Sequence, residues 1–394
     1  MTIRRLPGDF WVRERLREGV ARAMSPEPGP GREVGVWVLM KGSLSTPEAT
    51  AKLARALGLA PAAVTHAGLK DKHALTEQHV CVRATAADRA EGPGWSARRL
   101  GFSSQVLTAA DIECNEFEII VRDLGRTACN EMLTRARGLG AESGGAWFVN
   151  YFGDQRFGSA RHGEGFAAAH LVKGESIEAV RLLIAAPARK DTGTRRAFTR
   201  VAAARWGEWA ALAKGLPRCP ERAAVEVLAA GGSGAEAFAA LPHFLQEICV
   251  DAWQSHLWND AAGLLVRGTR ADMRAEPGDR KETHLLAAAR ATELADVKMP
   301  LPGPEMVMRE PWGGAMDAVL RGAGVSAGEL RVPGLRRPRF GSPERAVLAR
   351  ASGFSLDGPR EDTEVSGRGR MMMRVRFELP SGSYATEVLR ALGQ

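Results

Sequence analysis

The sequence predicts an α+β protein in which a largely helical domain interrupts a domain built around a β-sheet. The chain has 394 residues, more than one ordinary hydrophobic core accommodates, so two domains are expected. Strand patterns lie toward both ends of the chain, whereas Ala-rich helical patterns dominate from His162 to about Val266. We therefore expect residues 157–340 to form the inserted domain, with residues 1–156 and 341–394 together forming the other.

Three strands and one helix are expected in the first 83 residues. Residues 7–14 alternate apolar and polar side chains, as a half-buried strand does, and residues 34–40 and 78–83 read as further strands. Thr46 precedes a proline and an acidic residue, which predicts a helix that has this hydroxyl as its cap and ends near Gly58. This order of elements fits either an α/β or an α+β arrangement.

The remaining elements of the sheet-containing domain follow the same rules. Residues 115–122 predict a strand with Asn115 and Phe117 on one face, and residues 127–139 predict a helix. Near the end of the chain, residues 371–378 alternate as a strand does and residues 384–392 have a helical pattern.

Composition narrows the functional classes. The net charge of +8 favours a polyanionic partner, among which nucleic acid is the most common. The chain lacks the glycine-rich phosphate-binding motifs, Cys-x-x-Cys pairs and paired His/Cys spacings, so neither a nucleotide cofactor nor a metal is expected. No apolar run reaches the length of a membrane span and no signal peptide is recognised, which favours the cytoplasm.

Two arginine-rich segments lie in the C-terminal third. Interrupted by Gly and Pro, they suit phosphate contacts, although a solvated charged face is the alternative. The first contains Arg331, Arg336, Arg337 and Arg339, and the second contains Arg368, Arg370, Arg374 and Arg376.

The most informative stretch is residues 67–78, where Asp71 stands between Lys70 and Lys72. Cations within a few ångströms favour the ionised carboxylate and lower its pKa, which suits a nucleophile or a base. A solvated turn with alternating charges is the alternative. The rest of the chain decides between the two.

Two other polar segments stand out against their surroundings. Asn115 heads an apolar strand face, where its amide must find a partner in the backbone or in a ligand; a turn residue is the plainer alternative. Residues 150–158 combine aromatic side chains, an amide, an arginine and two glycines, a mixture typical of a loop that meets a ligand.

Taken in order, these segments resemble the TruD family of tRNA pseudouridine synthases, over nearly the whole chain. The motifs are Asp-Phe-x-Val-x-Glu, Ala-Gly-x-Lys-Asp-Lys-x-Ala-x-Thr-x-Gln, Asn-x-Phe, Asn-Tyr-Phe-Gly-x-Gln-Arg-Phe-Gly, Gln-Ser-x-x-x-Asn and Leu-Pro-x-Gly-x-Tyr/Phe-Ala-Thr. They stand here at residues 9–14, 67–78, 115–117, 150–158, 254–259 and 379–386. Cys114 departs from the family, which commonly has glycine before the asparagine.

The resemblance implies a pseudouridine synthase core with a mixed antiparallel sheet, interrupted by the family's helical TRUD insertion domain. It also implies that Asp71 is the catalytic aspartate. The residues expected around the substrate are Phe10, Asn115, Phe117, Tyr384, Lys70, Lys72, Arg122, Gln155 and Arg156. Arg122 and Arg156 are alternatives to the two lysines as ion-pair partners of Asp71.

The implied reaction converts uridine 13 of tRNA to pseudouridine, by a monomer and without a cofactor or metal. A carboxylate can attack C1′ or remove the 2′ proton, and the sequence does not choose between these routes. The target base must be flipped out of its stack and held on aromatic rings. The same chemistry on another RNA, and a non-catalytic RNA-binding or RNA-folding protein, are the alternatives.

Overall fold

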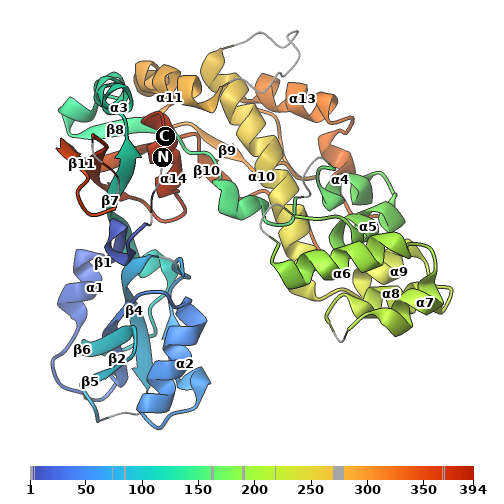
Figure 1. The fold of residues 1–394 in the computed structure, drawn as a ribbon, viewed down its shortest axis with the longest axis horizontal. Helices are drawn as coiled ribbons and strands as arrows, with labels where there is room; N and C mark the ends of the chain where they lie inside the picture. The colour runs from blue at the N-terminus through green and yellow to red at the C-terminus, as the bar shows by residue number, and fades with distance from the viewer. Residues whose placement is uncertain are drawn as a thin grey trace. The chain divides into compact units, whose positions relative to one another are not determined.

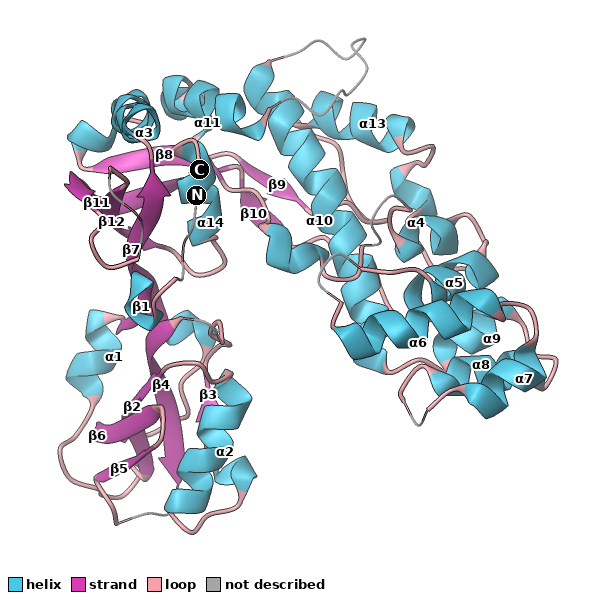
Figure 2. Ribbon diagram, viewed as in Figure 1, coloured by secondary structure: helices cyan, strands magenta, loops and turns pink. Residues whose placement is uncertain are grey.

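The computed structural model describes residues 3, 5–72, 74–83, 86–160, 164–188, 191–217, 219–268, 279–365, 367 and 369–394. Its contacts divide the chain into two compact units, the first made of residues 1–148 and 349–394 and the second of residues 149–348. Both helices and a large sheet are present (Figure 1, Figure 2), so the predicted α+β class is confirmed. Two positions named above, Arg368 and His162, lie outside the described residues.

The first unit contains the large sheet and a few helices. Its strands are β1 (Phe10–Leu16), β2 (Val34–Lys41), β3 (Val64–His66), β4 (Leu75–Arg83), β5 (Arg89–Gly92), β6 (Trp95–Ser103), β7 (Ile112–Leu124), β8 (Gly145–Val149), β11 (Leu348–Glu361) and β12 (Met371–Leu379). Its α-helices are α1 (Glu18–Ala23), α2 (Thr46–Ala56), α3 (Arg126–Gly138) and α14 (Ala385–Ala391). Strands predicted at residues 34–40, 115–122 and 371–378 correspond to β2, β7 and β12.

The sheet has ten strands in the order β5-β6-β2-β4-β1-β7-β12-β11-β8, with β3 added beside β4. Strand β1 lies near its middle, parallel to β4 and antiparallel to β7. Strand β12, from the end of the chain, pairs antiparallel with β7. The sheet is therefore mixed, and its centre joins strands from both ends of the chain.

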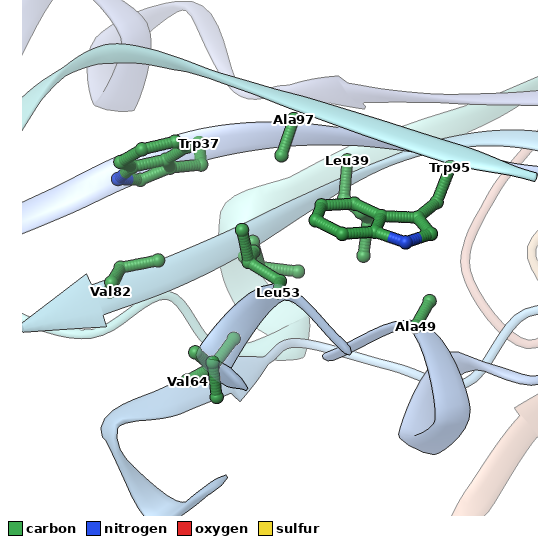
Figure 3. Packing of buried hydrophobic residues seen from close by; sticks show 10 residues of the cluster. Trp37, Leu39, Ala49, Leu53, Val64, Val82, Trp95 and Ala97 are labelled. Atoms are coloured by element: carbon green, nitrogen blue, oxygen red, sulfur yellow. The ribbon is translucent and has the colours of Figure 1, made fainter. Parts of the chain in front are cut away.

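Helix α2 covers one face of the sheet around β2 and β4. Ala49 and Leu53 of the helix belong to one buried hydrophobic cluster with Trp37 and Leu39 of β2 (Figure 3). Alternation along β2 places Lys41 on this same face, two residues beyond Leu39. The apolar packing therefore fixes α2 and β2 together at the end where Lys41 lies.

The helix α2 begins differently from the prediction. Ser45, not Thr46, is its N-cap: the Ser45 hydroxyl accepts a hydrogen bond from the Glu48 amide, and the Glu48 carboxylate accepts one from the Ser45 amide. This capping box satisfies two amides that the first turn would leave unpaired. The Thr46 hydroxyl is thereby left for other contacts. Gly58 has a φ of 70°, a conformation that favours glycine, and it follows the helix end as expected.

The second unit is largely helical. Its α-helices are α4 (Ala167–Val172), α5 (Ser176–Ala185), α6 (Gly193–Ala204), α7 (Trp209–Gly215), α8 (Arg222–Ala229), α9 (Gly234–Ala239), α10 (His243–Arg267), α11 (Arg280–Ala289), α12 (Ala291–Leu294) and α13 (Gly313–Gly322). Two short strands, β9 (Lys298–Pro300) and β10 (Glu344–Ala346), pair antiparallel.

Helix α10 is the buried axis of this second unit. Its Gln254 amide donates to the carbonyls of Pro302 and Gly341, and its Asn259 side chain exchanges two hydrogen bonds with the backbone of Phe152. These buried amides hold loops on α10, which accounts for the Gln-Ser-x-x-x-Asn pattern in structural terms. Within the residues that the structure describes, no helix is long and apolar enough to cross a membrane.

Candidate active site

Asp71 lies on the connection between β3 and β4, here called the Asp71 loop (residues 67–72). The loop is tied down on both sides of the aspartate. The Lys70 amide donates to the Thr46 hydroxyl at 2.9 Å, and the Lys41 ammonium donates to the Asp71 carbonyl oxygen at 2.9 Å. Thr46 in turn donates to the Gln78 side chain at 2.9 Å. The backbone that carries the carboxylate is therefore fixed to α2, β2 and β4.

The two lysines beside Asp71 pair with other carboxylates. The Lys70 ammonium lies 2.5 Å from a carboxylate oxygen of Glu14 in β1, and the Lys72 ammonium lies 3.2 Å from Glu48 in α2. The Lys70–Glu14 pair is nearly excluded from water, whereas the Lys72–Glu48 pair is about half exposed. The sequence predicts that the two flanking lysines lower the pKa of Asp71. In the structure both lysines pair with other carboxylates instead, and these two ion pairs anchor the loop.

Glu14 links the loop to the centre of the sheet. It is buried, and its second carboxylate oxygen accepts a hydrogen bond from the His79 amide at 2.7 Å. Burial alone would raise the pKa of Glu14, but the hydrogen bonds from His79 and the ammonium of Lys70 outweigh it, so the pKa is lowered. The carboxylate of Glu14 is therefore ionised at neutral pH.

Asn115 stands directly opposite Glu14 in the β1–β7 ladder, so their side chains share one face. The side-chain oxygen Oδ1 of Asn115 is buried and has no hydrogen-bond partner among the described residues. Nearby on the same face, Nε2 of Gln78 and Oγ1 of Thr76 are in the same condition. A buried acceptor beside buried donors suits a polar ligand, because unpaired polar atoms are costly to bury.

A row of phenyl rings crosses the same face of the sheet. Phe117 in β7 meets Phe10 of β1 edge to face at 6.2 Å and stacks on Phe377 of β12 at 5.3 Å between ring centroids. Phe10 and Phe377 are buried, while Phe117 keeps part of its surface accessible. Tyr384 is the N-cap residue of α14, just beyond the end of β12, where Leu379 pairs with Asn115.

Arg122 is buried and contacts three carboxylates, of which Asp9 and Asp362 are buried as well. Its guanidinium is 2% exposed and contacts Asp9 at 2.9 Å, Asp362 at 2.7 Å and Glu364 at 2.6 Å. These contacts tie the segment before β1 to the segment after β11. This geometry supports a structural role for Arg122, which holds the residues just before β1 in place, next to Phe10.

The remaining predicted substrate contacts, Gln155 and Arg156, belong to the second unit. Both lie in a short 3-10 helix, Asp154–Phe157. Gln155 is exposed. Arg156 pairs with Asp251 at 3.0 Å and donates to the Ser255 hydroxyl, so α10 holds its guanidinium.

The two arginine segments have different surroundings. In the second segment Arg374 and Arg376 pair with Glu118, and Arg370 pairs with Asp123. The first segment is exposed, and among the described residues none of its arginines pairs with a carboxylate: Arg331, Arg336, Arg337 and Arg339. In the part of the chain that the structure describes, no cluster of His, Cys, Asp or Glu has the form of a metal site.

Sequence reasoning missed Lys41, Thr46 and Glu14 as parts of this site. Lys41 offered a signal, because an ionisable residue there continues the face of Trp37 and Leu39 rather than the solvent side. Glu14 stands inside a motif, but its role depends on Lys70, which lies far along the chain. Thr46 was mistaken for a helix cap.

The fold and the site define the class of protein: an α+β protein with a loop-borne carboxylate beside an aromatic face of the sheet, where two buried amide atoms have no hydrogen-bond partner among the described residues. Comparisons with known proteins identify the family. The family model "tRNA pseudouridine synthase D (TruD)" matches residues 1–392. A tRNA pseudouridine synthase D of Aquifex aeolicus is 27% identical, covering 99% of this chain and 97% of its own.

Two further relatives agree. A protein of Pyrobaculum aerophilum named probable tRNA pseudouridine synthase D is 30% identical, covering 98% of this chain and 91% of its own. The crystal structure of a TruD protein from Methanosarcina mazei superposes with a TM-score of 0.73 at 24% identity, covering 99% of this chain and 92% of that one. The chain belongs to the TruD family.

Proposed function

We propose that this protein isomerises uridine to pseudouridine in tRNA, at uridine 13, with Asp71 as the catalytic carboxylate. The match to the family model over residues 1–392 supports the reaction class. The observation that carries the proposal is the geometry around Asp71: the backbone at this residue is held from both sides, next to a face where Asn115 Oδ1 and Gln78 Nε2 are buried without a hydrogen-bond partner among the described residues. Such preorganisation is what a reacting carboxylate requires.

The reaction breaks the C1′–N1 bond, turns the uracil and forms a C1′–C5 bond. In one route a carboxylate oxygen of Asp71 attacks C1′ while the electrons of the C1′–N1 bond leave with the uracil. C5 of the turned base then displaces the carboxylate, C5 loses its proton and N1 gains one. In the other route the carboxylate removes the 2′ proton while the C1′–N1 bond breaks, giving a glycal-like intermediate and the uracil anion. C5 of the turned base then bonds to C1′ as C2′ regains its proton, after which C5 loses a proton and N1 gains one. Both routes begin from an ionised Asp71.

Side chains near the Asp71 loop offer a hydrogen-bond acceptor and aromatic rings that can hold the detached uracil. Asn115 Oδ1 can accept a hydrogen bond from the N–H of the uracil edge, which would satisfy this buried oxygen. Phe10, Phe117 and Tyr384 offer rings on which a flipped base can stack. Flipping costs a few kcal/mol, so these contacts and those to phosphate must offset it.

We assign the other predicted contacts on the same basis. Lys70 and Arg122 hold the framework, through Glu14 and through the Asp9 network. Lys72 and Gln155 are exposed enough to meet RNA directly, and Arg156 presents a cation held by α10. The helical residues 157–340 we propose as the family's insertion domain, and the protein is expected to act as a monomer in the cytoplasm.

The test is pseudouridine mapping by chemical labelling of total RNA from cells with and without the protein. Loss of the signal at uridine 13 of particular tRNAs is the expected result. Loss at other positions would keep the chemistry and change the substrate. An unchanged map, together with tight binding of tRNA in vitro, would replace the enzyme by a non-catalytic RNA-binding protein.

A further inference from the structure

Lys41 is the last residue of strand β2 and lies in contact with the Asp71 loop. Its side chain is 1% exposed. The ammonium donates one hydrogen bond to the carbonyl of Leu44 at 2.8 Å and one to the carbonyl of Asp71 at 2.9 Å. In the ladder with β4, Lys41 stands opposite Thr76, so it lies on the face that also carries the buried amide of Gln78. The lysine therefore joins the end of β2 to the backbone of the catalytic residue.

Burial of the Lys41 ammonium is unfavourable for the stability of the folded protein. Within the described residues, no carboxylate lies in ion-pair contact with the Lys41 ammonium, and two neutral carbonyls are its hydrogen-bond acceptors. Burying a charge without a paired counter-charge is unfavourable. An apolar side chain of the same length would fill the space at lower cost, so stability alone does not account for a lysine here.

The charges around Lys41 show what the ammonium acts on. Asp71 and Lys70 face it from the loop, and Glu48 faces it from α2. Burial is the largest influence and lowers the pKa of Lys41 to about 8, while the negative charge of Asp71 is the strongest of the influences that oppose it. The interaction between the Lys41 ammonium and the negative charge of Asp71 is therefore attractive.

We propose that Lys41 is a positioning residue for Asp71, fixing its backbone carbonyl and placing a positive charge near the carboxylate. The inference rests on the proposed function of Asp71. It assigns to Lys41 the task that sequence reasoning gave to the two flanking lysines, which are paired with Glu14 and Glu48 instead. Lys41 itself does not touch the substrate in this scheme; it acts through Asp71.

The proposal gives activity an alkaline limit. Below pH about 8, Lys41 is charged in the folded protein, and above it the charge beside Asp71 is lost. Folding stability moves the other way. An unfolded lysine stays protonated to about pH 10.4, so between these values the unfolded chain binds more protons and the contribution of Lys41 to stability rises with pH. Activity and this contribution therefore have opposite slopes in the same window.

The first experiment compares Lys41→Met with Lys41→Arg and with Lys52→Met, a matched control at a partly exposed lysine of α2. Turnover is measured at saturating tRNA from about pH 6.5 to about pH 9.5. In Lys41→Met, kcat should fall on the order of 10²-fold, as for removal of one preorganised electrostatic contact. The KM for tRNA should stay within about twofold, the alkaline limb should disappear, and Lys41→Arg should recover part of kcat. Lys52→Met should match the wild type.

A second variant separates the charge from the anchoring of the loop. Thr46→Val removes the acceptor of the Lys70 amide but leaves the Lys41 ammonium in place. It should lower kcat less than Lys41→Met and keep the alkaline limb near pH 8. If Thr46→Val and Lys41→Met had the same kcat and the same pH profile, the role of the charge would be overturned.

A readout that needs no activity completes the test. In hydrogen exchange, the Lys70 amide should exchange about tenfold faster in Lys41→Met than in the wild type, because the loop is no longer held at the neighbouring carbonyl. Unchanged protection with unchanged kcat in a folded Lys41→Met would overturn the proposal. A wild type that makes no pseudouridine would instead overturn the proposed function, while exchange would still decide whether Lys41 anchors the loop.

Discussion

Both faces of the central strands β1 and β7 carry charged side chains, but these side chains are arranged differently on the two faces. On one face of β1 and β7, Glu14 and Asn115 are opposed, with the Asp71 loop held against Glu14 through Lys70. On the other face, Arg15 forms a bidentate pair with Glu378, and Arg376 pairs with Glu118. The first face has few charges, which are buried, and two amide atoms, Asn115 Oδ1 and Gln78 Nε2, that have no hydrogen-bond partner among the described residues. The other face carries a partly exposed network of ion pairs between carboxylates and arginines.

The difference teaches where function can lie. A lattice of mutually satisfied charges has nothing left for a ligand, and exposed ion pairs contribute little to stability. Buried groups with unused hydrogen-bonding capacity are costly, and are kept where a ligand completes them. Substitutions on the first face should therefore change the reaction, and substitutions on the second should change very little.

The largest effect is expected from Asp71→Asn. The amide cannot act as nucleophile or base, so product should fall below detection, a loss of more than about 10³-fold. The affinity for tRNA should stay within a few-fold, because the substitution removes one carboxylate from a large interface. Single-turnover assays and filter binding measure the two quantities. Pseudouridine formation by this variant would show that another residue is the reacting group.

The next effect is expected from Glu14→Gln, which leaves the Lys70 ammonium without its buried partner. The free energy of unfolding should fall by about 3 kcal/mol, measured by urea denaturation, and kcat should fall because Lys70 precedes Asp71. The pKa of Glu14 is lowered by folding, so its contribution is present above the unfolded value of about 4.3 and is lost as pH falls through the folded value. The difference from the wild type should therefore shrink in acid.

The control for that variant lies on the opposite face. Glu116→Gln removes a partly exposed carboxylate that pairs with Arg13 and Arg15. It should cost less than about 1 kcal/mol. Equal destabilisation by both variants would mean that the two faces are energetically alike.

A smaller effect is expected from Asn115→Ala, which removes the proposed acceptor for the uracil edge. Losing one such hydrogen bond should lower kcat/KM about tenfold, with folding stability nearly unchanged since Oδ1 has no partner to lose among the described residues. Asn130→Ala, at an exposed position of α3, is the matched control. A folded Asn115→Ala enzyme with the wild-type kcat/KM would remove Asn115 from the site.

The smallest effect is expected from Arg374→Gln with Arg376→Gln. Both guanidinium groups are already paired with Glu118, so kcat and the salt dependence of tRNA binding should not change. If these arginines bound phosphates, the slope of log affinity against log salt would become less steep by about 0.7 to 0.9 for each phosphate that is no longer neutralised. Titrations of tRNA at several salt concentrations distinguish the two results.

Much of the sheet was readable from the sequence because local patterns specify it. Strand β2 is a continuous apolar run, and β12 alternates buried and partly exposed residues. Each pattern therefore predicts a strand without reference to the rest of the chain. Strand β11 was not foreseen, because Gly353 and the Gly358–Pro359 pair interrupt its pattern and its register with β12 shifts twice. Only the partner strand makes that segment extended.

For the candidate site, local sequence indicates the residue types but not which side chains pair with each other. Asp71, Asn115 and Phe117 stand out in local sequence. Which carboxylate receives Lys70, or which of two arginine segments is already neutralised, depends on contacts between residues far apart in the chain. Charge runs of similar composition at Arg336 and at Arg374 have opposite surroundings, and no local pattern separates them.

The pairing of β7 with β12 has a consequence for the newly made chain. Strand β7 is complete at Leu124, but β12, its neighbour on one side, begins at Met371, after residues 149–348 have been synthesised as a separate compact unit. Until then one edge of β7 has no neighbouring strand, and the apolar side chains of Phe117 and Ile119 on the adjoining face lack the residues of β12 that stand opposite them. An exposed apolar edge of this kind invites association between chains. Chains truncated before Met371 should therefore be recovered chiefly as aggregates.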